Sequence, residues 1–173
     1  VVEWDIAKTN LIDEKVNETV GKMGKIDILI NNSGIYAPNN FFNTDEELFD
    51  EIMNTNLKGL FFTSKKISEY FIKNSIKGKI INIGSVRSFQ GGSEAYGISK
   101  WGVRGLTQGL ARDLAKYGIV VNAVAPGITA TGINGINIQN NAYSSSSLDS
   151  RVAIPEEIAE IVIFLSSNAS NHI

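Results

Sequence analysis

Short apolar runs alternate with longer amphipathic segments along this chain. Three of the runs, 26–30, 79–84 and 119–124, are rich in isoleucine and valine. Runs of this kind are typical of parallel strands that are covered on both faces. The segments between them repeat apolar residues at helical spacing. The pattern therefore predicts strands that alternate with helices, an arrangement that requires a parallel α/β sheet with right-handed crossovers.

The expected helices have recognisable ends. The first covers 13–23 and stops at Gly24, a residue that commonly ends helices. Thr44 has Glu47 three residues after it, which is the form of a capping box at the start of a second helix. Pro155 and the two acidic residues after it predict the start of the last helix, because proline and carboxylates suit the first turn.

Two features interrupt this alternation. Residues 1–6 have the pattern of a strand end, although no earlier strand or turn precedes them in the sequence. Asn54 and Asn56 break the apolar repeat of the second helix. Asparagine lowers helix propensity, so each of the two either lies on the solvated surface or has a function there. From their position in the sequence alone, a place on the solvated surface is the favoured interpretation of both asparagines.

Composition limits the possible functions. The 173 residues suffice for one domain, and 43% hydrophobic with 20% charged residues is typical of a soluble globular protein. The net charge of -2, without a basic block, gives no reason to expect a nucleic-acid partner. Apolar runs such as 161–165 are too short to cross a bilayer, and the N-terminus lacks a targeting pattern. We therefore expect a cytoplasmic protein without a membrane partner.

Two absences narrow the chemistry further. The chain has no cysteine, and its only histidine, His172, is the penultimate residue. Thiol nucleophiles, zinc sites built from Cys and His, and a Ser-His-Asp triad are therefore not expected, and no metal is needed. A proton-transfer site in this chain has to use Tyr, Lys, Asp or Glu.

Tyr96 and Lys100 form the best candidate for such a site. On a helix they lie one turn apart on the same face. A cation close to a phenol favours the phenolate and lowers the pKa of the tyrosine, so that it can exchange protons near neutral pH. The pair by itself also suits an exposed tyrosine over a lysine on a solvated helix face.

Three glycines, at positions 102, 105 and 109, follow in the same expected helix. Each costs roughly 0.5–1 kcal/mol relative to alanine. Close approach of this helix backbone to another element would compensate for that cost. The alternative is that core packing tolerates them.

Two loops lie where a ligand would bind. Residues 31–34 follow the run 26–30, at the carboxyl edge where open α/β sheets bind their ligands, although an ordinary turn has the same form. Residues 133–150 are rich in Asn, Gly and Ser. A loop of this length in a compact domain is more often a substrate loop or lid than filler, with disorder as the alternative.

In this order and spacing, the motifs resemble the short-chain dehydrogenase/reductase family of nicotinamide enzymes over nearly the whole chain. Asn31-Asn32-Ser33-Gly34 is similar to the family's NNAG loop, with serine in place of alanine. The other matching positions are Asn56 for the catalytic asparagine, Ser85 for the substrate serine, Tyr96 and Lys100 for YxxxK, Pro126-Gly127 for the PG motif, Thr131 for the threonine after it, and Asp5-Ile6 for the pair beside adenine.

The resemblance implies a role for each catalytic residue. Tyr96 would be the general acid or base at a carbonyl oxygen, and Lys100 would lower its pKa and bind the nicotinamide ribose. Ser85 would hold the substrate oxygen, and the Asn56 backbone would fix a water that relays protons from Lys100. The stretch from Ser85 to Tyr96 is slightly shorter than in the family.

The resemblance also implies a cofactor, NAD or NADP, and a small carbonyl or alcohol substrate of the 3-oxoacyl-thioester or sugar and polyol type. The residues expected to bind the cofactor are Asp5, Ile6, Asn32, Ser33, Gly34, Tyr96, Lys100, Pro126, Gly127, Thr129 and Thr131. The full-length form would be a homotetramer. The alternative is a non-catalytic fragment that acts as an assembly or binding module through the helix containing 102–109.

The implied fold is a Rossmann-like, doubly wound parallel sheet that lacks the first βαβα portion and the last strand. Residues 1–173 would be one partial NAD(P)-binding domain, with 133–150 as its substrate or lid loop. The family's TGxxxGxG phosphate turn is not in the sequence. The missing first strand would lie beside 26–30, so we expect an unpaired apolar edge there. The 173-residue chain alone should be unstable or aggregation-prone and bind dinucleotide poorly.

Overall fold

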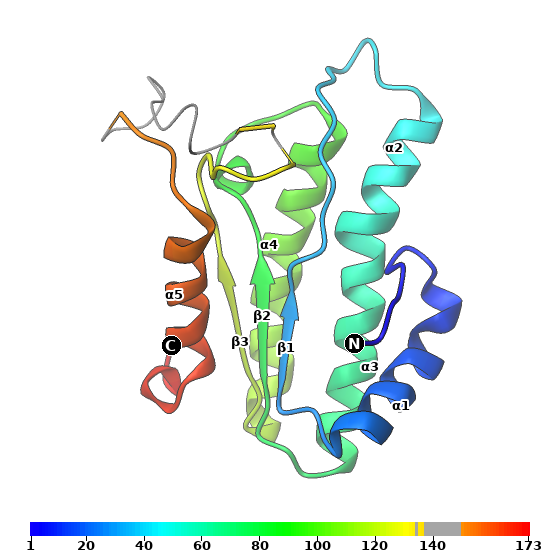
Figure 1. The fold of residues 1–173 in the computed structure, drawn as a ribbon, viewed down its shortest axis with the longest axis vertical. Coiled ribbons are helices and arrows are strands. Elements are labelled where there is room, and N and C mark those ends of the chain that lie inside the picture. Colours follow the sequence, from blue (N-terminus) through cyan, green and yellow to red (C-terminus); the bar gives the residue numbers. More distant parts are fainter. Residues whose placement is uncertain (134, 137–149) are drawn as a thin grey trace.

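The computed structural model describes residues 1–133, 135–136 and 150–173, and its centre is a parallel sheet. The strands are β1 (Ile28–Asn31), β2 (Lys79–Ile83) and β3 (Val120–Val124), hydrogen-bonded in the order β1-β2-β3 (Figure 1). All three apolar runs thus form strands, as the sequence predicts. Their carboxyl ends lie at the same edge of the sheet, because the strands are parallel.

Helices cover both faces of this sheet. They are α1 (Ile12–Met23), α2 (Glu46–Met53), α3 (Leu60–Lys73), α4 (Ala95–Leu114) and α5 (Pro155–Ser166). Helices α3 and α4 pack on one face and α5 on the other (Figure 1). Within the described residues, every helix is too short or too polar to traverse a lipid bilayer.

The larger core lies between the sheet and helices α1, α3 and α4. Its buried members are Ile12, Val16, Ile67, Phe71, Ile80, Leu114, Ile119 and Val121. Each such side chain stabilises the fold by about 1.5–3 kcal/mol relative to full exposure. Residues of α1, α3, β2, α4 and β3 meet there, so this core holds the alternating elements together.

Helix α5 is attached to the other face. Leu165 packs against Ile81 and Val124, which project from β2 and β3 on that side. At the C-terminal end of α5, buried Lys79 donates hydrogen bonds from Nζ to the Ser167 carbonyl oxygen (2.7 Å) and to Ser170 Oγ (2.9 Å). These contacts fix α5 to the central strand along its whole length.

A buried polar network links the carboxyl ends of β1 and β2 to the helices behind them. Asn31 Nδ2 donates to Asn82 Oδ1 (2.8 Å) and to Ser64 Oγ on α3 (2.9 Å). Asn82 Nδ2 donates to Thr107 Oγ1 on α4 (2.9 Å). Buried hydrogen bonds of this kind fix a single arrangement, because leaving any member unpaired is costly. The network therefore sets the position at which the 31–34 loop leaves the sheet.

Strand β1 differs from the expectation for a strand covered on both faces. Ile28 and Ile30 are 40% and 45% exposed, on the face that α5 covers only near β2 and β3. In the described sheet β1 pairs only with β2. The expectation that both faces of the strand at 26–30 would be covered was therefore wrong. The expected unpaired apolar edge is present.

Some predicted element ends are confirmed and others are wrong. Helix α1 ends at Gly24, whose φ of 83° places it in the region that favours glycine, and Pro155 is the first residue of α5. Asp45 rather than Thr44 caps α2, since Asp45 Oδ1 accepts from the Leu48 N–H (2.9 Å). Residues 1–5 form no strand and pair with none of the three described strands.

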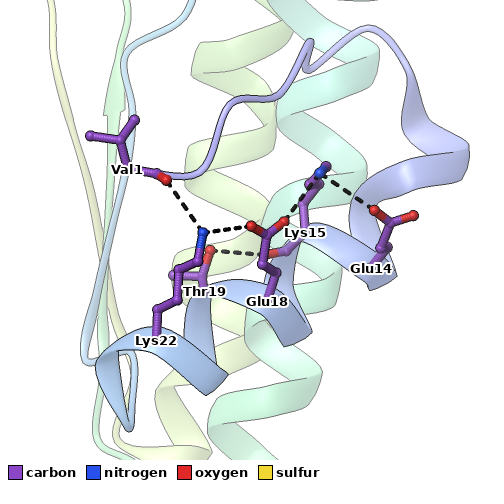
Figure 2. A network of polar contacts seen from close by, with 6 residues as sticks. All are labelled: Val1, Glu14, Lys15, Glu18, Thr19 and Lys22. Carbon is purple, nitrogen blue, oxygen red and sulfur yellow. Dashed lines mark hydrogen bonds and ion pairs between the residues drawn. The ribbon is translucent and has the colours of Figure 1, made fainter.

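Helix α1 carries a ladder of exposed ion pairs. Figure 2 shows Lys15 between Glu14 and Glu18, with Lys22 reaching Glu18 at 2.7 Å. The hydrogen bonds from Lys22 and Lys15 lower the pKa of the Glu18 carboxyl. Exposed pairs three and four residues apart on a helix favour it only slightly. Their contribution is local to α1.

The glycines of α4 do not share one explanation. A Cβ on Gly102 would lie 2.6 Å from the Leu57 side chain, so the close approach expected for these glycines is confirmed at this position. A Cβ on Gly105 or Gly109 would meet nothing within 4 Å. Contact with another element therefore accounts for only one of the three.

Candidate active site

A cavity of about 610 Å³ opens at the carboxyl edge of the sheet. It lies between the loops that follow β1, β2 and β3, one turn of α4, and the first half of α5. Its lining includes the predicted site residues Asn32, Gly34, Ser85, Tyr96, Lys100, Pro126, Gly127, Thr129 and Thr131. Segments far apart in the sequence thus meet at one site, as expected for an open parallel sheet.

Lys100 is buried beside Tyr96 on α4. Its side chain reaches the end of β2, where Nζ donates to the Ile83 carbonyl oxygen (2.9 Å), and Nζ lies 5.6 Å from the centre of the Tyr96 ring. The residue is only 6% exposed, so the alternative of a solvated helix face is wrong. Burial lowers the pKa of Lys100 to about 8. At neutral pH it is a buried cation close to its titration point.

The pKa of Tyr96 differs from the expectation. Burial raises it, a hydrogen bond with Ser85 and the charge of Arg87 lower it, and the net pKa lies above the ordinary value. The Lys100 ammonium is placed over the ring and bonds to Ile83. The lowering by Lys100 that the sequence suggested is therefore not found, because burial is the largest influence on this pKa and the groups that lower it are Ser85 and Arg87.

Ser85 meets Tyr96 from the end of β2. It caps the 3-10 turn Val86–Phe89, and its Oγ accepts from the Arg87 N–H (3.2 Å). The residue is buried and lines the cavity. Its hydroxyl lies close enough to the Tyr96 phenol to lower the pKa of that group. Two hydroxyl groups from different elements therefore face the same space.

Asn56 is buried behind the cavity wall. It lies in a π-helical turn, Asn54–Gly59, which joins α2 to α3. Its Oδ1 accepts from the Ile35 N–H (2.8 Å), and its Nδ2 donates to the Ile35 carbonyl (2.9 Å) and to Ser99 Oγ (3.2 Å). At 1% exposure, the interpretation of Asn56 as a surface residue is wrong. Its side chain fixes the loop after β1, and π turns are frequent at functional sites.

Three of the predicted cofactor residues, Asp5, Ile6 and Ser33, do not line the cavity. Asp5 instead accepts a hydrogen bond from the Ala7 N–H (3.0 Å). The Ile6 backbone packs on the π turn, where a Cβ on Gly59 would lie 2.6 Å from the Ile6 carbonyl oxygen. These residues therefore lie outside the cavity, and their part in binding the cofactor stays a prediction.

Sequence reasoning missed the contribution of α5. This helix makes one wall of the cavity apolar. Its lining residues are Pro155, Ile158, Ala159, Val162 and Ile163. Ile158 and Val162 are one helical turn apart, a signal that identified the helix but not which surface it would face.

The expected substrate loop, 133–150, lies largely outside the described residues, which include only 133, 135, 136 and 150 of it. The segments that flank it meet in a parallel bridge. The Ala130 N–H donates to the Ala153 carbonyl (2.9 Å), and the Ala153 N–H donates to the Ile128 carbonyl (3.0 Å). Both ends of the loop are therefore fixed next to the cavity lined by Thr129 and Thr131.

The lining fits the nicotinamide end of a dinucleotide. A Cβ on Gly34 would lie 3.5 Å from Asn56 Oδ1 and 3.6 Å from Lys100 Nζ, so the backbone at Gly34 lies close to both polar groups. An ammonium has three N–H donors, and the Lys100 ammonium uses one of them for Ile83. Hydroxyl groups of Ser85 and Tyr96 complete a donor and acceptor set for a ribose and a carbonyl oxygen.

Comparison with known proteins agrees with this geometry. A family model described as "Enoyl-(Acyl carrier protein) reductase" matches residues 1–173, the whole of the chain. The chain belongs to the short-chain dehydrogenase/reductase family.

The chain is similar to curated relatives that are longer than it is. One is the 2-dehydro-3-deoxy-D-gluconate 5-dehydrogenase of Dickeya dadantii, 39% identical over 91% of this chain and 65% of the relative. Another is a 3-oxoacyl-(acyl-carrier-protein) reductase of Buchnera aphidicola, 36% identical over 99% of this chain and 71% of the relative. The chain thus spans about two thirds of their length.

A solved structure confirms the fold. The 3-ketoacyl-(acyl-carrier-protein) reductase of Brucella melitensis, complexed with NADH, is 28% identical and has a TM-score of 0.87. The match covers 99% of this chain and 72% of that one. The Rossmann-like, doubly wound sheet predicted from the sequence is therefore correct, and it is present here in part.

Proposed function

We propose that this chain carries the catalytic part of an NAD(P)-dependent oxidoreductase that acts on a carbonyl or secondary alcohol. The observation that carries the proposal is the meeting of Ser85, Tyr96 and Lys100 at one cavity. Bound NAD or NADP would supply or accept the hydride. The residues of the chain supply position and protons.

Tyr96 acts as the general acid in reduction and as the base in the reverse direction. The raised pKa keeps the phenol protonated at neutral pH, which suits donation to a carbonyl oxygen as hydride arrives. The Ser85 hydroxyl holds the same oxygen, so the proton moves over a hydrogen-bond distance. Because two donors are fixed before the substrate binds, little reorganisation is needed.

Lys100 binds the ribose hydroxyls, and its ammonium lies over the Tyr96 ring. Its lowered pKa of about 8 makes it able to pass on a proton near neutral pH. In this proposal the backbone of Asn56 holds the water that connects Lys100 to solvent. Asn56 lies in a π turn, and π turns are frequent at functional sites, which supports this role.

The substrate class follows from the wall that α5 contributes. Ile158, Val162 and Ile163 give the cavity an apolar side opposite the polar Ser85. This suits a 3-oxoacyl thioester, and a sugar or polyol acid is the other class named among the relatives. As part of the same proposal, the full-length enzyme forms the homotetramer that the family resemblance implies.

Replacing Tyr96 with Phe tests the proposed function, in the longest polypeptide that carries residues 1–173. We expect kcat for reduction of a 3-oxoacyl thioester to fall by about 10²–10⁴-fold, the usual contribution of a general acid. Binding of reduced dinucleotide, followed by fluorescence, should change little. Exposed Tyr117 provides the matched control, since Tyr117→Phe removes an identical hydroxyl elsewhere.

The alternative predicts a different result. If dinucleotide binds but Tyr96→Phe turns over substrate like the unmodified protein, Tyr96 is not the acid and the proposal fails. A folded protein that neither binds dinucleotide nor turns over any carbonyl substrate would favour the assembly or binding module.

A further inference from the structure

An ion pair joins the two ends of the loop between Ser85 and Tyr96. Arg87 lies two residues after Ser85, and Glu94 lies two residues before Tyr96. Arg87 Nε donates to Glu94 Oε1 (3.0 Å), and Nη2 donates to the same oxygen. Arg87 Nη1 also donates to Gln90 Oε1 (3.3 Å) inside the loop. The pair thus closes a short loop whose ends carry the two reacting hydroxyl groups.

Two glycines leave the space that the Glu94 carboxylate occupies. Its side chain is 13% exposed, and a Cβ on Gly97 would lie 2.7 Å from its Oε1, while one on Gly92 would lie 2.8 Å from its Oε2. Burial raises the pKa of Glu94, but the bond from Arg87 and nearby backbone N–H groups bring the net pKa below its usual value. Glycine at both positions therefore leaves space for an ionised carboxylate.

Helix α4 fixes the rest of the loop independently. Trp101 Nε1 donates to the Gln90 carbonyl (2.8 Å), and Arg104 Nη1 donates to the Ser88 carbonyl (2.9 Å). The Arg104 guanidinium also lies 4.2 Å from the centre of the Phe89 ring. These contacts hold the middle of the loop on α4, so the Arg87–Glu94 pair is not needed for the loop to fold. Its place at the loop ends points to a different task.

We propose that the Arg87–Glu94 pair is a positioning device, which holds the Ser85 hydroxyl against the Tyr96 phenol and keeps a cation beside it. This inference rests on the proposed function. The Arg87 backbone N–H donates to Ser85 Oγ (3.2 Å), so a shift of the Arg87 backbone would move the serine hydroxyl as well. Neither residue touches the reacting atoms.

Charges from several elements face the Tyr96 phenol. Lys100 lies on the same helix, Arg87 on the turn after β2, and Tyr36, with its ring 5.2 Å from that of Tyr96, on the loop after β1. The Arg87 charge lowers the pKa of Tyr96, against the larger effect of burial. Loss of the positioned guanidinium should therefore raise the pKa of Tyr96 further.

Gly97→Ala tests the device without removing either charge. The added methyl group takes the space of the Glu94 carboxylate and displaces it from Arg87. The helix itself should not be weakened, because alanine favours a helix more than glycine does. Gly105→Ala is the matched control, because it adds the same methyl group to the same helix in open space. Arg87→Gln removes the cation itself and provides a second variant.

The first readout needs no cofactor. Phenolate absorbance is measured against pH for each variant and again for that variant with Tyr96→Phe added. Subtracting the second curve from the first leaves the titration of Tyr96 and removes that of the other four tyrosines. We expect Tyr96 to titrate at higher pH in Gly97→Ala and Arg87→Gln, and at the original pH in Gly105→Ala. The second readout is turnover, where kcat should fall about tenfold in the first two variants with KM little changed.

The outcomes separate the two proposals. Tyr96→Phe with full activity overturns the proposed function. If Tyr96→Phe is inactive but Gly97→Ala and Arg87→Gln titrate and turn over like the control, the positioning device is refuted and the proposed function stands.

Discussion

Lys100 shows at the level of one residue how the site opposes stability. Its ammonium is buried, it has one hydrogen-bond acceptor in Ile83, and no carboxylate within ion-pair distance is described for it. A buried unpaired charge is unfavourable, which is why burial lowers its pKa. The fold tolerates this group because other contacts are strong enough to hold α4 in place.

The pH dependence of stability tests this description of Lys100. The pKa is about 8 in the folded chain and 10.5 in the unfolded one, so between these values the unfolded chain binds more protons. The free energy of unfolding should therefore rise from pH 8 to 10.5, by roughly 3 kcal/mol, relative to a chain without this group. Below pH 8 both states are charged and this contribution is constant.

Lys100→Met supplies the reference, since it keeps the length of the side chain and cannot titrate. Urea unfolding of both proteins across this pH range gives the difference in free energy at each pH. Parallel curves for the two proteins would contradict the lowered pKa of Lys100.

At the scale of elements, much of the architecture could be predicted from the sequence. The strands were found because their apolar runs are short and β-branched, and α1 because Gly24 ends it. The π turn Asn54–Gly59 could not be predicted, since it depends on packing of Asn56 against a distant loop. Residues 1–5 were assigned wrongly because a strand needs a partner as well as a pattern.

The site was predictable to a similar extent. Tyr96 and Lys100 carry a sequence motif, and the burial of Lys100 with partial burial of Tyr96 agrees with a function for it. The wall from α5 and the Arg87–Glu94 pair carry no motif, because their importance depends on which surfaces the folded elements bring together. The pKa direction of Tyr96 was missed for the same reason, since burial is not visible in a sequence.

The packing of residues 5 and 6 on the π turn makes a prediction about elements. A Cβ on Gly59 would lie 2.6 Å from the Ile6 carbonyl oxygen, a backbone atom that cannot move away cheaply. Gly59→Ala should therefore destabilise the fold by about 1–3 kcal/mol, as overpacking does. Gly21 in α1 has open space, and Gly21→Ala should stabilise it by roughly 0.5–1 kcal/mol.

Urea unfolding of the two alanine variants measures both effects. Opposite signs are expected for the same chemical change. A neutral Gly59→Ala would mean that the N-terminal segment is not held against the π turn, and that the placement of Asp5 and Ile6 beside the site is wrong.

For the whole molecule, the layers are unequal. One face of the sheet is covered by α3 and α4 across all three described strands, whereas α5 covers only β2 and β3 on the other face (Figure 1). Ile28 and Ile30 remain exposed on a strand with one free edge. Unpaired apolar edges promote association between chains.

We therefore expect the 173-residue polypeptide to self-associate through β1. Ile28→Lys should reduce that association, because an edge lysine opposes strand pairing between copies. Ile72 on α3 is similarly exposed, at 37% against 40% for Ile28, so Ile72→Lys adds the same charge away from the edge. Sedimentation velocity over a range of protein concentrations measures the mass distribution of each variant.

The comparison between the two variants decides which surface is responsible. A shift toward monomer in Ile28→Lys alone identifies the edge, and with it the expectation that this chain by itself is aggregation-prone. An equal shift in both variants would indicate that added charge, rather than the edge, controls solubility. Monomeric unmodified chain that binds reduced dinucleotide with micromolar affinity would refute the expectation. The exposed face and free edge of β1 would then be tolerated in water, and the cavity would hold dinucleotide without further sequence.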